Sequence, residues 1–235
     1  MKAMILAAGL GKRLRPLTLQ TPKPLLPVAG KPLIVYHIEK LATSGIQDIV
    51  INISWLGHKI REYLGDGSRW HIRLHYSHET EPLETGGGIL KALPLLGNGP
   101  FIVINSDIYS SFSPETLSLP AGKLAHLVMV SNPAFHEQGD FLLSHGVLSN
   151  PFNRTNRKPD NNQRLTFSGI SMLTPELFKN CKAGAFPLAP LLTDAMTSKK
   201  ISGHYFPGYW IDAGTSDRMQ SLDNYLSQLR LNGNS

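Results

Sequence analysis

The sequence has one cysteine, Cys181, among its 235 residues. A single cysteine cannot form an intrachain disulfide or a zinc site built from several cysteines, and such usage is typical of a reducing compartment. No apolar run approaches the roughly 18 residues that a membrane-spanning helix needs. The first apolar run leads straight into GKRLRP, unlike the apolar segment of a secretory signal. The sequence therefore predicts a cytoplasmic protein without a membrane partner.

Blocks of like charge are also missing, although the formal net charge is +6. Basic and aromatic residues do not alternate in the way that RNA-binding modules show, so nucleic acid is not the expected partner. The nine histidines are scattered, without the spacing of a zinc pair. Heptads and internal repeats are absent, and a monomer or a small homo-oligomer is expected. The basic excess suits small polyanionic substrates.

The most informative stretch is the opening one, KAMILAAGLGKRLRPLTLQTPKPLLP, at residues 2–27. Its apolar start has the length of a buried strand and is followed by Gly9, Gly11 and then Arg13. Glycines permit a tight turn whose N–H groups form an anion-binding nest, and fixed cations beside it would complete a polyphosphate cradle. On the glycines alone, an ordinary turn with solvated basic residues explains the pattern equally well.

Lys23 lies between Pro22 and Pro24 in the same stretch. Proline fixes its own φ and restricts the residue before it, so Lys23 is held on stiff backbone. This favours a cation that meets a phosphate at a set distance over one that serves only solubility. No GxxxxGK[ST] motif is present, and Leu14 stands where a dinucleotide fingerprint needs its third glycine. The sequence thus excludes the two commonest nucleotide-binding loops.

Strand and helix patterns alternate along the first hundred residues. Apolar, isoleucine-rich runs predict strands, and apolar residues at helical spacing predict helices. The expected strands are 3–7, 46–54, 72–78 and 101–104, and the expected helices are 33–43, 58–64 and a segment ending at 96. Such alternation predicts an α/β fold with a Rossmann-like mixed, mainly parallel sheet and helices on both faces. Ligands of these sheets bind beyond the carboxyl ends of the strands, where the opening loop lies.

The second half of the sequence is less regular. It predicts strands, a hairpin that turns near Gly146, and two helices, the second of which ends near residue 229. The expected strands are 126–130 and 165–173, and the hairpin is 141–149. The expected helices are 186–197 and the stretch after 215. Residues 150–163 are dense in Asn, Pro, Arg and Lys, which predicts a long exposed loop or a partly mobile lid.

Two aspartates directly follow apolar runs: Asp107 after FIVINS and Asp212 after YWI. An unpaired carboxylate at the end of a buried strand is costly, and a metal ion would neutralise it. A turn-forming role for Asp107 and a helix N-terminal role for Asp212 are the alternatives.

Glu81 precedes three consecutive glycines, Gly86 to Gly88, in the stretch EPLETGGG. Each glycine costs about 1 kcal/mol relative to alanine if it is helical. One interpretation is a flexible loop. The other is a surface where a flat base and a ribose approach the backbone closely, with Glu81 accepting N–H groups of the base.

The pattern G-x-G-x-R-L-x-P-L-T-x3-P-K-P-L-x-P resembles the signature of the sugar-1-phosphate nucleotidylyltransferases, and EPLETGGG, NSD and WIDAGT follow in the family's order. The resemblance covers essentially the whole chain. It implies a magnesium-dependent enzyme that transfers a nucleotidyl group from a nucleoside triphosphate to a sugar-1-phosphate and releases pyrophosphate. The segments EPLETGGG, GDF, FSGI and GAFPLAPLL are most similar to the subfamily that uses UTP and N-acetylmuramate-1-phosphate in peptidoglycan recycling.

Two alternatives stay open. One is another subfamily, with GTP and mannose-1-phosphate or dTTP and glucose-1-phosphate. The other is a catalytically silent module that binds a nucleotide-sugar.

The resemblance implies a role for each residue that matches a family motif. Arg13 would bind the β- and γ-phosphates, and Lys23 the α-phosphate and the attacking phosphate. The implied nucleotide-binding residues are Ala8, Gly9, Gly11, Lys23, Glu81 and Gly86; the implied sugar-binding residues are Asn105, Gly139, Asp140, Ser168 and Gly169; the implied metal ligands are Asp107 and Asp212. No general base is implied, because a phosphate with a second pKa of about 6 is already mostly ionised at pH 7.

The chain departs from the family pattern at two places. Ser106 replaces the usual glycine before Asp107, and the Glu-Lys-Pro whose lysine holds the sugar phosphate is absent. Lys158 stands in an Arg-Lys-Pro instead, and we expect it not to take that role. We expect one domain over 1–230 with a nucleotide-binding half at 1–110 and a sugar-phosphate-binding half at 111–215, followed by a tail at 231–235.

Overall fold

The protein is described here by a computed structural model that covers residues 1–151 and 163–233. The strands of its large sheet are β1 (Lys2–Leu6), β4 (Asp48–Ile53), β5 (Arg73–His78), β6 (Phe101–Asn105), β8 (Ala125–Val130), β9 (Phe141–Ser144), β10 (Val147–Ser149), β11 (Gln163–Leu173) and β12 (Ile201–Tyr205). Two small ribbons pair β2 (Pro27–Val28) with β3 (Lys31–Pro32) and β7 (Ile108–Ser110) with β13 (Trp210–Asp212).

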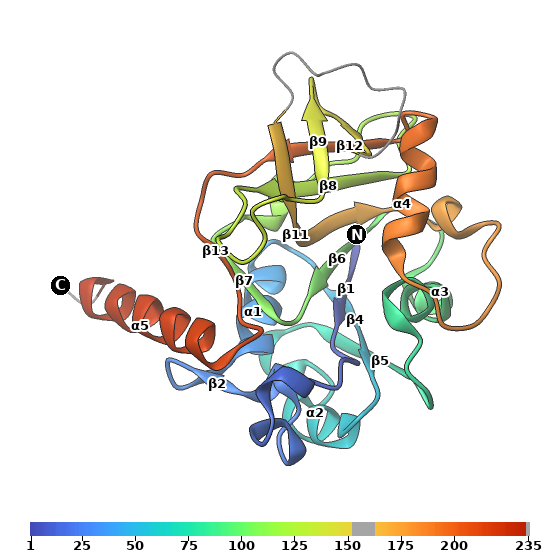
Figure 1. The fold of residues 1–235 in the computed structure, drawn as a ribbon. Helices are drawn as coiled ribbons and strands as arrows, with labels where there is room; N and C mark the ends of the chain where they lie inside the picture. The colour runs from blue at the N-terminus through green and yellow to red at the C-terminus, as the bar shows by residue number, and fades with distance from the viewer. Residues whose placement is uncertain (152–162, 234–235) are drawn as a thin grey trace.

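The large sheet has the strand order β5-β4-β1-β6-β11-β8-β12-β10-β9 (Figure 1). Strands β5, β4, β1 and β6 are parallel, so their carboxyl ends lie at one edge of the sheet. From β6 onward the pairing is antiparallel, except for the parallel pair β12 and β8. The predicted mixed α/β fold is confirmed, and its parallel character is concentrated in the first half of the chain.

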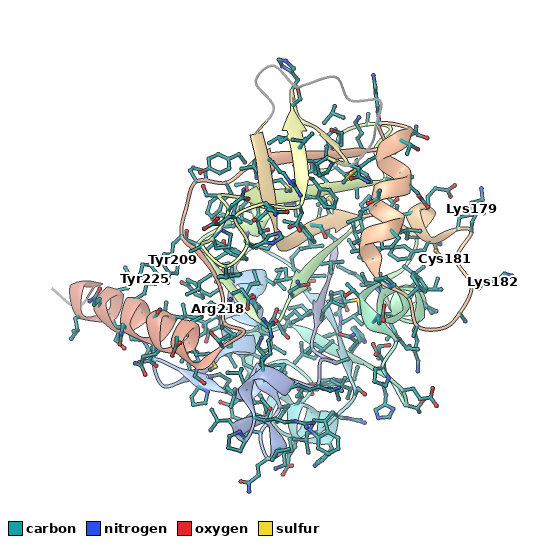
Figure 2. The ribbon with its side chains drawn as sticks, in the orientation of Figure 1. Lys179, Cys181, Lys182, Tyr209, Arg218 and Tyr225 are labelled. Carbon is teal, nitrogen blue, oxygen red and sulfur yellow. The ribbon has the colours of Figure 1, made fainter. Side chains whose placement is uncertain are left out.

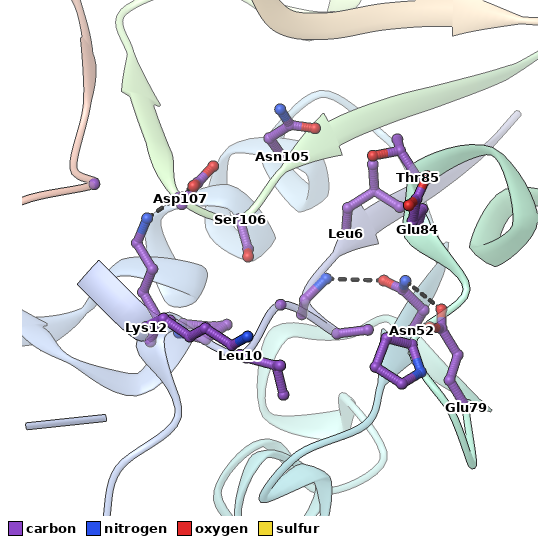
Figure 3. Close-up of a pocket in the computed structure, with 18 of the residues that line it drawn as sticks. Leu6, Leu10, Lys12, Asn52, Glu79, Glu84, Thr85, Asn105, Ser106 and Asp107 are labelled. Atoms are coloured by element: carbon purple, nitrogen blue, oxygen red, sulfur yellow. Dashed lines mark hydrogen bonds and ion pairs between the residues drawn. The ribbon is translucent and has the colours of Figure 1, made fainter. Parts of the chain in front are cut away.

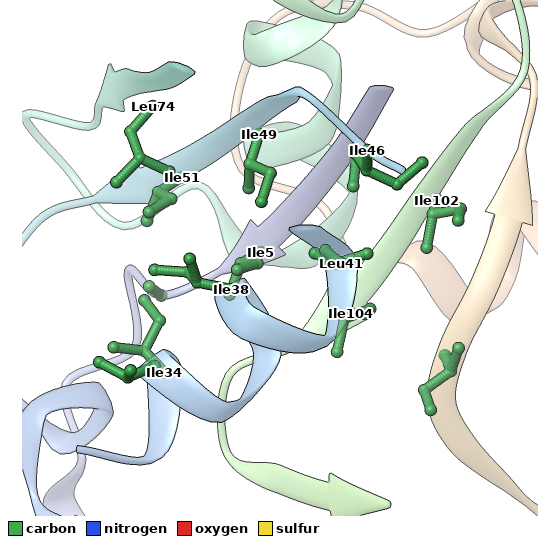
Figure 4. Close-up of a cluster of buried hydrophobic side chains, with 14 of the residues drawn as sticks. Ile5, Ile34, Ile38, Leu41, Ile46, Ile49, Ile51, Leu74, Ile102 and Ile104 are labelled. Carbon is green, nitrogen blue, oxygen red and sulfur yellow. The ribbon is translucent and has the colours of Figure 1, made fainter. Parts of the chain in front are cut away.

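Helices cover both faces of the sheet, as predicted. They are α1 (Leu33–Thr43), α2 (Gly57–Leu64), α3 (Glu84–Leu96), α4 (Leu188–Thr197) and α5 (Ser216–Gly233). Side chains from α1 and α2 share one apolar cluster with Ile5 of β1 (Figure 4), while those from α3 and α4 share another with Met4. Because both faces of β1 are buried, its sequence is continuously apolar rather than alternating.

Helix α5 is attached to the rest of the protein through a third, smaller cluster. Leu222 and Leu226 are buried against the β2–β3 ribbon, and Tyr225 stacks on Tyr209 with 3.6 Å between ring centroids (Figure 2). The far end of the helix extends away from the body of the molecule (Figure 1). No helix in the described part of the chain is long and apolar enough to span a membrane.

Most predicted elements agree with the structure, and α1 has the predicted bounds. The interpretation of Gly86 to Gly88 as a loop is wrong, because all three lie inside α3. The sequence analysis also missed β12 and the β7–β13 ribbon, since these strands are short or contain glycine. Of the predicted loop at 150–163, residues 152–162 lie outside the described residues.

Candidate active site

A cavity of about 490 Å³ lies at the carboxyl ends of the parallel strands (Figure 3). It is lined by residues 6–14, Lys23, Pro24, Asn52, Glu79, residues 82–85, residues 105–107 and Gly214. The opening loop forms one wall and the start of α3 forms another. The cavity therefore brings together Ala8, Gly9, Gly11, Arg13 and Lys23, which the sequence analysis assigned to phosphate and nucleotide binding.

The two glycines of the opening loop have different structural roles. Gly11 has a φ of +61°, in the left-handed region, and a Cβ there would lie 2.8 Å from Cγ2 of Thr18. Thr18 also donates a hydrogen bond from Oγ1 to the carbonyl oxygen of Gly11, at 2.8 Å. Gly9 has no atoms within 4 Å of its would-be Cβ. Gly11 thus shapes the loop, and Gly9 leaves room for a ligand to approach the backbone.

Lys23 is the buried cation of the cavity, with a relative exposure of 9%. It begins a short 3-10 helix, Lys23–Leu25, whose backbone contains Pro24. Its Nζ lies 2.7 Å from Oδ2 of Asp107 (Figure 3). A residue predicted to bind phosphate and a residue predicted to bind metal therefore form an ion pair with one another.

The β7–β13 ribbon brings Asp107 and Asp212 to the same place. Asp212 is paired with Ile108, and the N–H of Ala213 donates to the carbonyl oxygen of Asp107 at 2.8 Å. Oδ1 of Asp212 is buried and has no hydrogen-bond partner among the described residues, while Oδ2 lies 3.4 Å from Nη2 of Arg218.

These two carboxylates fit a magnesium ion better than a transition metal. The described residues contain no group of three or more His, Cys, Asp or Glu that could hold a metal by themselves. Magnesium needs only one or two protein carboxylates, because substrate phosphates and water complete its oxygen ligands. The unpartnered oxygen of Asp212 is the kind of ligand such an ion uses.

A second cavity, of about 310 Å³, shares Asn105 and Asp107 with the first. Its lining includes the predicted sugar-binding residues Asp140 and Ser168, together with Asp212. The Asp140 carboxylate accepts from the N–H of Phe167 at 2.8 Å and contacts Nε2 of His136 at 2.9 Å. Ser168 accepts at its carbonyl oxygen from Nε1 of Trp210 at 2.8 Å. Of the two predicted metal ligands, Asp107 lines both cavities and Asp212 lines the second.

The predicted sugar-site glycines shape this region without lining the second cavity. Gly169 has a φ of +82°, and a Cβ there would lie 2.7 Å from Nδ2 of Asn105. Gly139 has a φ of +61°, and a Cβ there would lie 2.9 Å from the carbonyl oxygen of Leu165. Both positions need glycine for backbone conformation and close packing, and they place Asn105 and Asp140.

Glu81 and Gly86 are not among the residues that line either cavity. Glu81 is exposed, and Gly86 is buried against Phe186, whose carbonyl oxygen accepts the Gly86 N–H at 2.9 Å. A Cβ at Gly86 would lie 2.4 Å from the Phe186 ring. The glycine therefore permits close packing within the protein. Contact of either residue with nucleotide stays a prediction.

The sequence analysis missed Asn52 and Glu79, which the structure places in the first cavity. Oδ1 of Asn52 accepts the N–H of Ala7 at 2.8 Å, and its Nδ2 donates to Oε1 of Glu79 at 2.7 Å (Figure 3). Glu79 is 2% exposed, and its Oε2 accepts the N–H of Leu83 at 3.2 Å. Asn52 follows the apolar run IVI near the end of β4, which is the signal that identified Asp107. Glu79 follows the largely polar strand RLHYSH, so no such signal marks it.

Gly88 makes room for this chain of hydrogen bonds, since a Cβ there would lie 2.6 Å from Oε1 of Glu79. Ser106, where the family has glycine, is 5% exposed and donates its N–H to the carbonyl oxygen of Leu6 at 3.1 Å. The serine is therefore accommodated next to β1. Lys158 lies outside the described residues.

Comparison with known proteins places this geometry in a family. The profile described as nucleotidyl transferase matches residues 2–227. An N-acetylmuramate alpha-1-phosphate uridylyltransferase of Neisseria meningitidis serogroup B is 44% identical over 227 residues, covering 94% of this chain and 96% of the relative. A protein of the same name from Caulobacter vibrioides is 31% identical over 228 residues, covering 90% and 91%.

A solved structure supports the fold. A Bacillus anthracis protein crystallised with sucrose superimposes with a TM-score of 0.82 at 22% identity, covering 97% of this chain and 95% of the other. At that identity the likeness concerns the fold alone. The extent of the sequence match and the identity to relatives of equal length carry the conclusion that the chain belongs to the nucleotidyl transferase family, as its opening motif predicted.

Proposed function

We propose that this protein transfers the uridylyl group of UTP to N-acetylmuramate-1-phosphate and releases pyrophosphate. The observation that carries the reaction is the pair of adjoining cavities: Asp107 lines both, Lys23 lines the first and pairs with Asp107, and Asp212 lines the second. The support for this substrate pair is the 44% identity, over nearly the full length of both chains, to a relative named for it. The cavity of the opening loop would take UTP, and the second would take the sugar.

The proposed chemistry needs no general base. A phosphate oxygen of the sugar-1-phosphate attacks the α-phosphorus of UTP, and the bond from that phosphorus to the oxygen bridging to the β-phosphate breaks. Pyrophosphate leaves with the electron pair of that bond. The attacking phosphate is already mostly ionised at pH 7, because its second pKa is about 6. The difficulty is to bring two polyanions together, so positioning and charge neutralisation are the expected sources of catalysis.

The residues of the junction have the charges that this task requires. Lys23 lines the first cavity and contacts Asp107, which lines both, so its ammonium group would donate to the α-phosphate and to the attacking phosphate. Arg13, on the opening loop, would bind the β- and γ-phosphates. The open space at Gly9 would let the triphosphate approach the loop backbone.

Asp107 and Asp212 would hold magnesium. When bound, the ion would neutralise negative charge on the phosphates of the transferring group. The unpartnered Oδ1 of Asp212 supports this role for that residue. Asp107 already contacts Lys23, so its carboxylate would serve both the ion and the lysine.

Pyrophosphate release across a matrix of substrates tests the proposal. UTP, GTP, dTTP and CTP are each combined with N-acetylmuramate-, N-acetylglucosamine-, glucose- and mannose-1-phosphate, with magnesium. We expect release only with UTP and N-acetylmuramate-1-phosphate. The Asp107→Asn variant serves as the inactive control.

Release with another pair would overturn the substrate assignment and keep the reaction type. Folded protein that binds UTP but releases no pyrophosphate in any combination would overturn the enzymatic function in favour of a nucleotide-binding module.

A further inference from the structure

Arg218 lies near the start of α5, at the end of the helix closest to the body of the molecule (Figure 2). Its guanidinium carbon is 4.0 Å from the centre of the Phe135 ring, and its Nη2 is 3.4 Å from Oδ2 of Asp212. Nε and Nη2 of Arg218 are buried and have no hydrogen-bond partner among the described residues. A buried donor without an acceptor destabilises the folded protein. Such a cation is therefore suited to an anionic ligand.

The guanidinium groups of Arg218 and Arg13 both approach Gly214. A Cβ built on Gly214 would lie 2.6 Å from Nη2 of Arg218, 2.8 Å from Nη2 of Arg13 and 2.5 Å from Oδ1 of Asp212. Two positive guanidinium groups therefore converge beside a single carboxylate. Like charges repel at this separation, so a further negative group between the two arginines would stabilise the arrangement.

This point of convergence lies between the two cavities. Arg13 and Gly214 line the first cavity, and Phe135 and Asp212 line the second. The ring of Phe135 supports Arg218 from the sugar side. In an in-line transfer, the attacking phosphate must lie between the sugar and the α-phosphorus, which is this junction.

We infer that Arg218 binds the phosphate of the sugar-1-phosphate in the space that Gly214 leaves open, while Arg13, beside the same space, binds the β- and γ-phosphates of UTP. The inference rests on the proposed function. A guanidinium group donates two parallel hydrogen bonds to a phosphate, so the pair would fix both the position and the orientation of the nucleophile. Among the described residues, Arg218 supplies the sugar-phosphate cation that the missing Glu-Lys-Pro motif supplies in the family.

Binding measurements without turnover test Arg218 directly. Calorimetry on the wild type, Arg218→Gln and Arg218→Lys uses UTP alone or one sugar ligand alone. The sugar ligands are N-acetylmuramate-1-phosphate, N-acetylglucosamine-1-phosphate, which has no carboxylate, and N-acetylmuramate, which has no phosphate. Arg61→Gln, at an exposed position of α2, is the matched control.

For Arg218→Gln we expect both sugar phosphates to bind about 10- to 100-fold more weakly, the loss expected for a hydrogen bond to a charged group. Binding of N-acetylmuramate and of UTP should change by less than about threefold, because neither engages this side chain. The affinity of Arg218→Lys for the sugar phosphates should lie between those of the wild type and Arg218→Gln, since lysine keeps the charge but cannot donate two parallel hydrogen bonds. Arg61→Gln should match the wild type.

A loss confined to the ligands that carry the N-acetylmuramate carboxylate would overturn the inference and assign Arg218 to that carboxylate. An equal loss for UTP would assign it to the triphosphate, and unchanged binding would make it a structural residue. If Arg218→Gln does not fold, Gly214→Ala keeps both arginines and places a methyl group between them. This variant should bind both sugar phosphates more weakly, as Arg218→Gln does. Wild-type affinity for them in this variant would overturn the inference.

Failure of the proposed reaction gives a different result. Wild-type protein that binds sugar phosphates but releases no pyrophosphate would overturn the reaction, while the comparison of Arg218 variants would still decide the role of this residue.

Discussion

Lys23 and Asp107, 84 positions apart in the sequence, form an ion pair at 2.7 Å between Nζ and Oδ2. The pair joins the opening loop to the end of β6, the central strand that adjoins β1. It neutralises the carboxylate and holds the lysine in the first cavity beside Asp107, which lines both cavities. A cation that engages Asp107 would compete with Lys23 and leave the lysine available to substrate phosphate. The two residues are therefore expected to act as a unit.

Lys23→Ala should lower turnover by about 10²- to 10³-fold, the usual loss when one donor to a developing charge is removed. Its effect on the free energy of unfolding should stay near 1 kcal/mol or below, because the Asp107 side chain is 34% exposed and its pairing is screened by water. Pyrophosphate release and urea denaturation measure the two effects. Lys179→Ala, at an exposed lysine, is the control, and an unchanged rate in Lys23→Ala would remove Lys23 from the mechanism.

Asp212→Asn should weaken binding of Mn²⁺, used as a stand-in for Mg²⁺, by at least about 10-fold. Mutation of a residue that only hydrogen-bonds a metal ligand already causes a loss of that size. The unpartnered Oδ1 of Asp212 is the reason to expect a direct ligand. Electron paramagnetic resonance of free Mn²⁺ measures the affinity in the absence of nucleotide. Asp217→Asn, at an exposed aspartate in the first turn of α5, should behave as the wild type. Equal Mn²⁺ affinity in the two variants would contradict the metal site.

Glu79→Gln should destabilise the protein by about 1–3 kcal/mol. The carboxylate accepts hydrogen bonds from Nδ2 of Asn52 and from the N–H of Leu83, and a glutamine would turn its own NH₂ group toward one of these two donors. The same variant should raise KM for UTP, since Glu79 lines the first cavity. Glu81→Gln should leave both quantities within error, because Glu81 is exposed and outside the cavity lining. A raised KM only in Glu81→Gln would instead support the base-contacting role that the family resemblance implies for Glu81.

Gly86→Ala should destabilise the protein by about 1–3 kcal/mol through overpacking, although alanine is the better helix former. Its Cβ would lie 2.4 Å from the ring of Phe186. Gly99→Ala, where nothing lies within 4 Å, is the matched control. In a double-mutant cycle measured by urea denaturation, Phe186→Ala should remove most of the cost of Gly86→Ala. Additive effects would show that the clash is relieved elsewhere.

His37 should make the protein sensitive to mild acid. Burial lowers the pKa of His37 to about 4, and its Nε2 has no hydrogen-bond partner among the described residues. Between the ordinary pKa of 6.5 and about 4, the unfolded chain binds a proton that the folded protein does not. Stability is therefore lost as the pH falls through this range, by about 2 kcal/mol at pH 5.

Urea denaturation at pH 7 and pH 5 measures the loss of unfolding free energy on acidification. In His37→Leu this loss should be smaller than in the wild type by about 2 kcal/mol. His58→Gln, at an exposed histidine, should retain the full loss. The same acid loss in His37→Leu as in the wild type would assign the sensitivity to another group.

Local patterns in the sequence predicted the elements that local physics decides. The bounds of α1 follow from apolar residues at helical spacing and from Gly45 just beyond the helix. The strands of the parallel half were predictable because burial on both faces makes their sequences continuously apolar. The opening motif identified the family for a similar reason, since Gly11 and Lys23 are restricted by turn geometry and by proline, which act over a few residues.

Relationships between distant residues were decided by the tertiary structure alone. Asp107 and Asp212 were predicted as a pair from the family resemblance, but their adjacency depends on the short β7–β13 ribbon, which has no recognisable pattern in the sequence. The packing roles of the α3 glycines also depend on the tertiary structure, because Gly86 and Gly88 make room for Phe186 and Glu79. Glu79, two positions before Glu81, has the same side chain, and only the end of β5 distinguishes the buried position from the exposed one. Sequence patterns record which residues are buried, and strand pairing determines which buried residues meet.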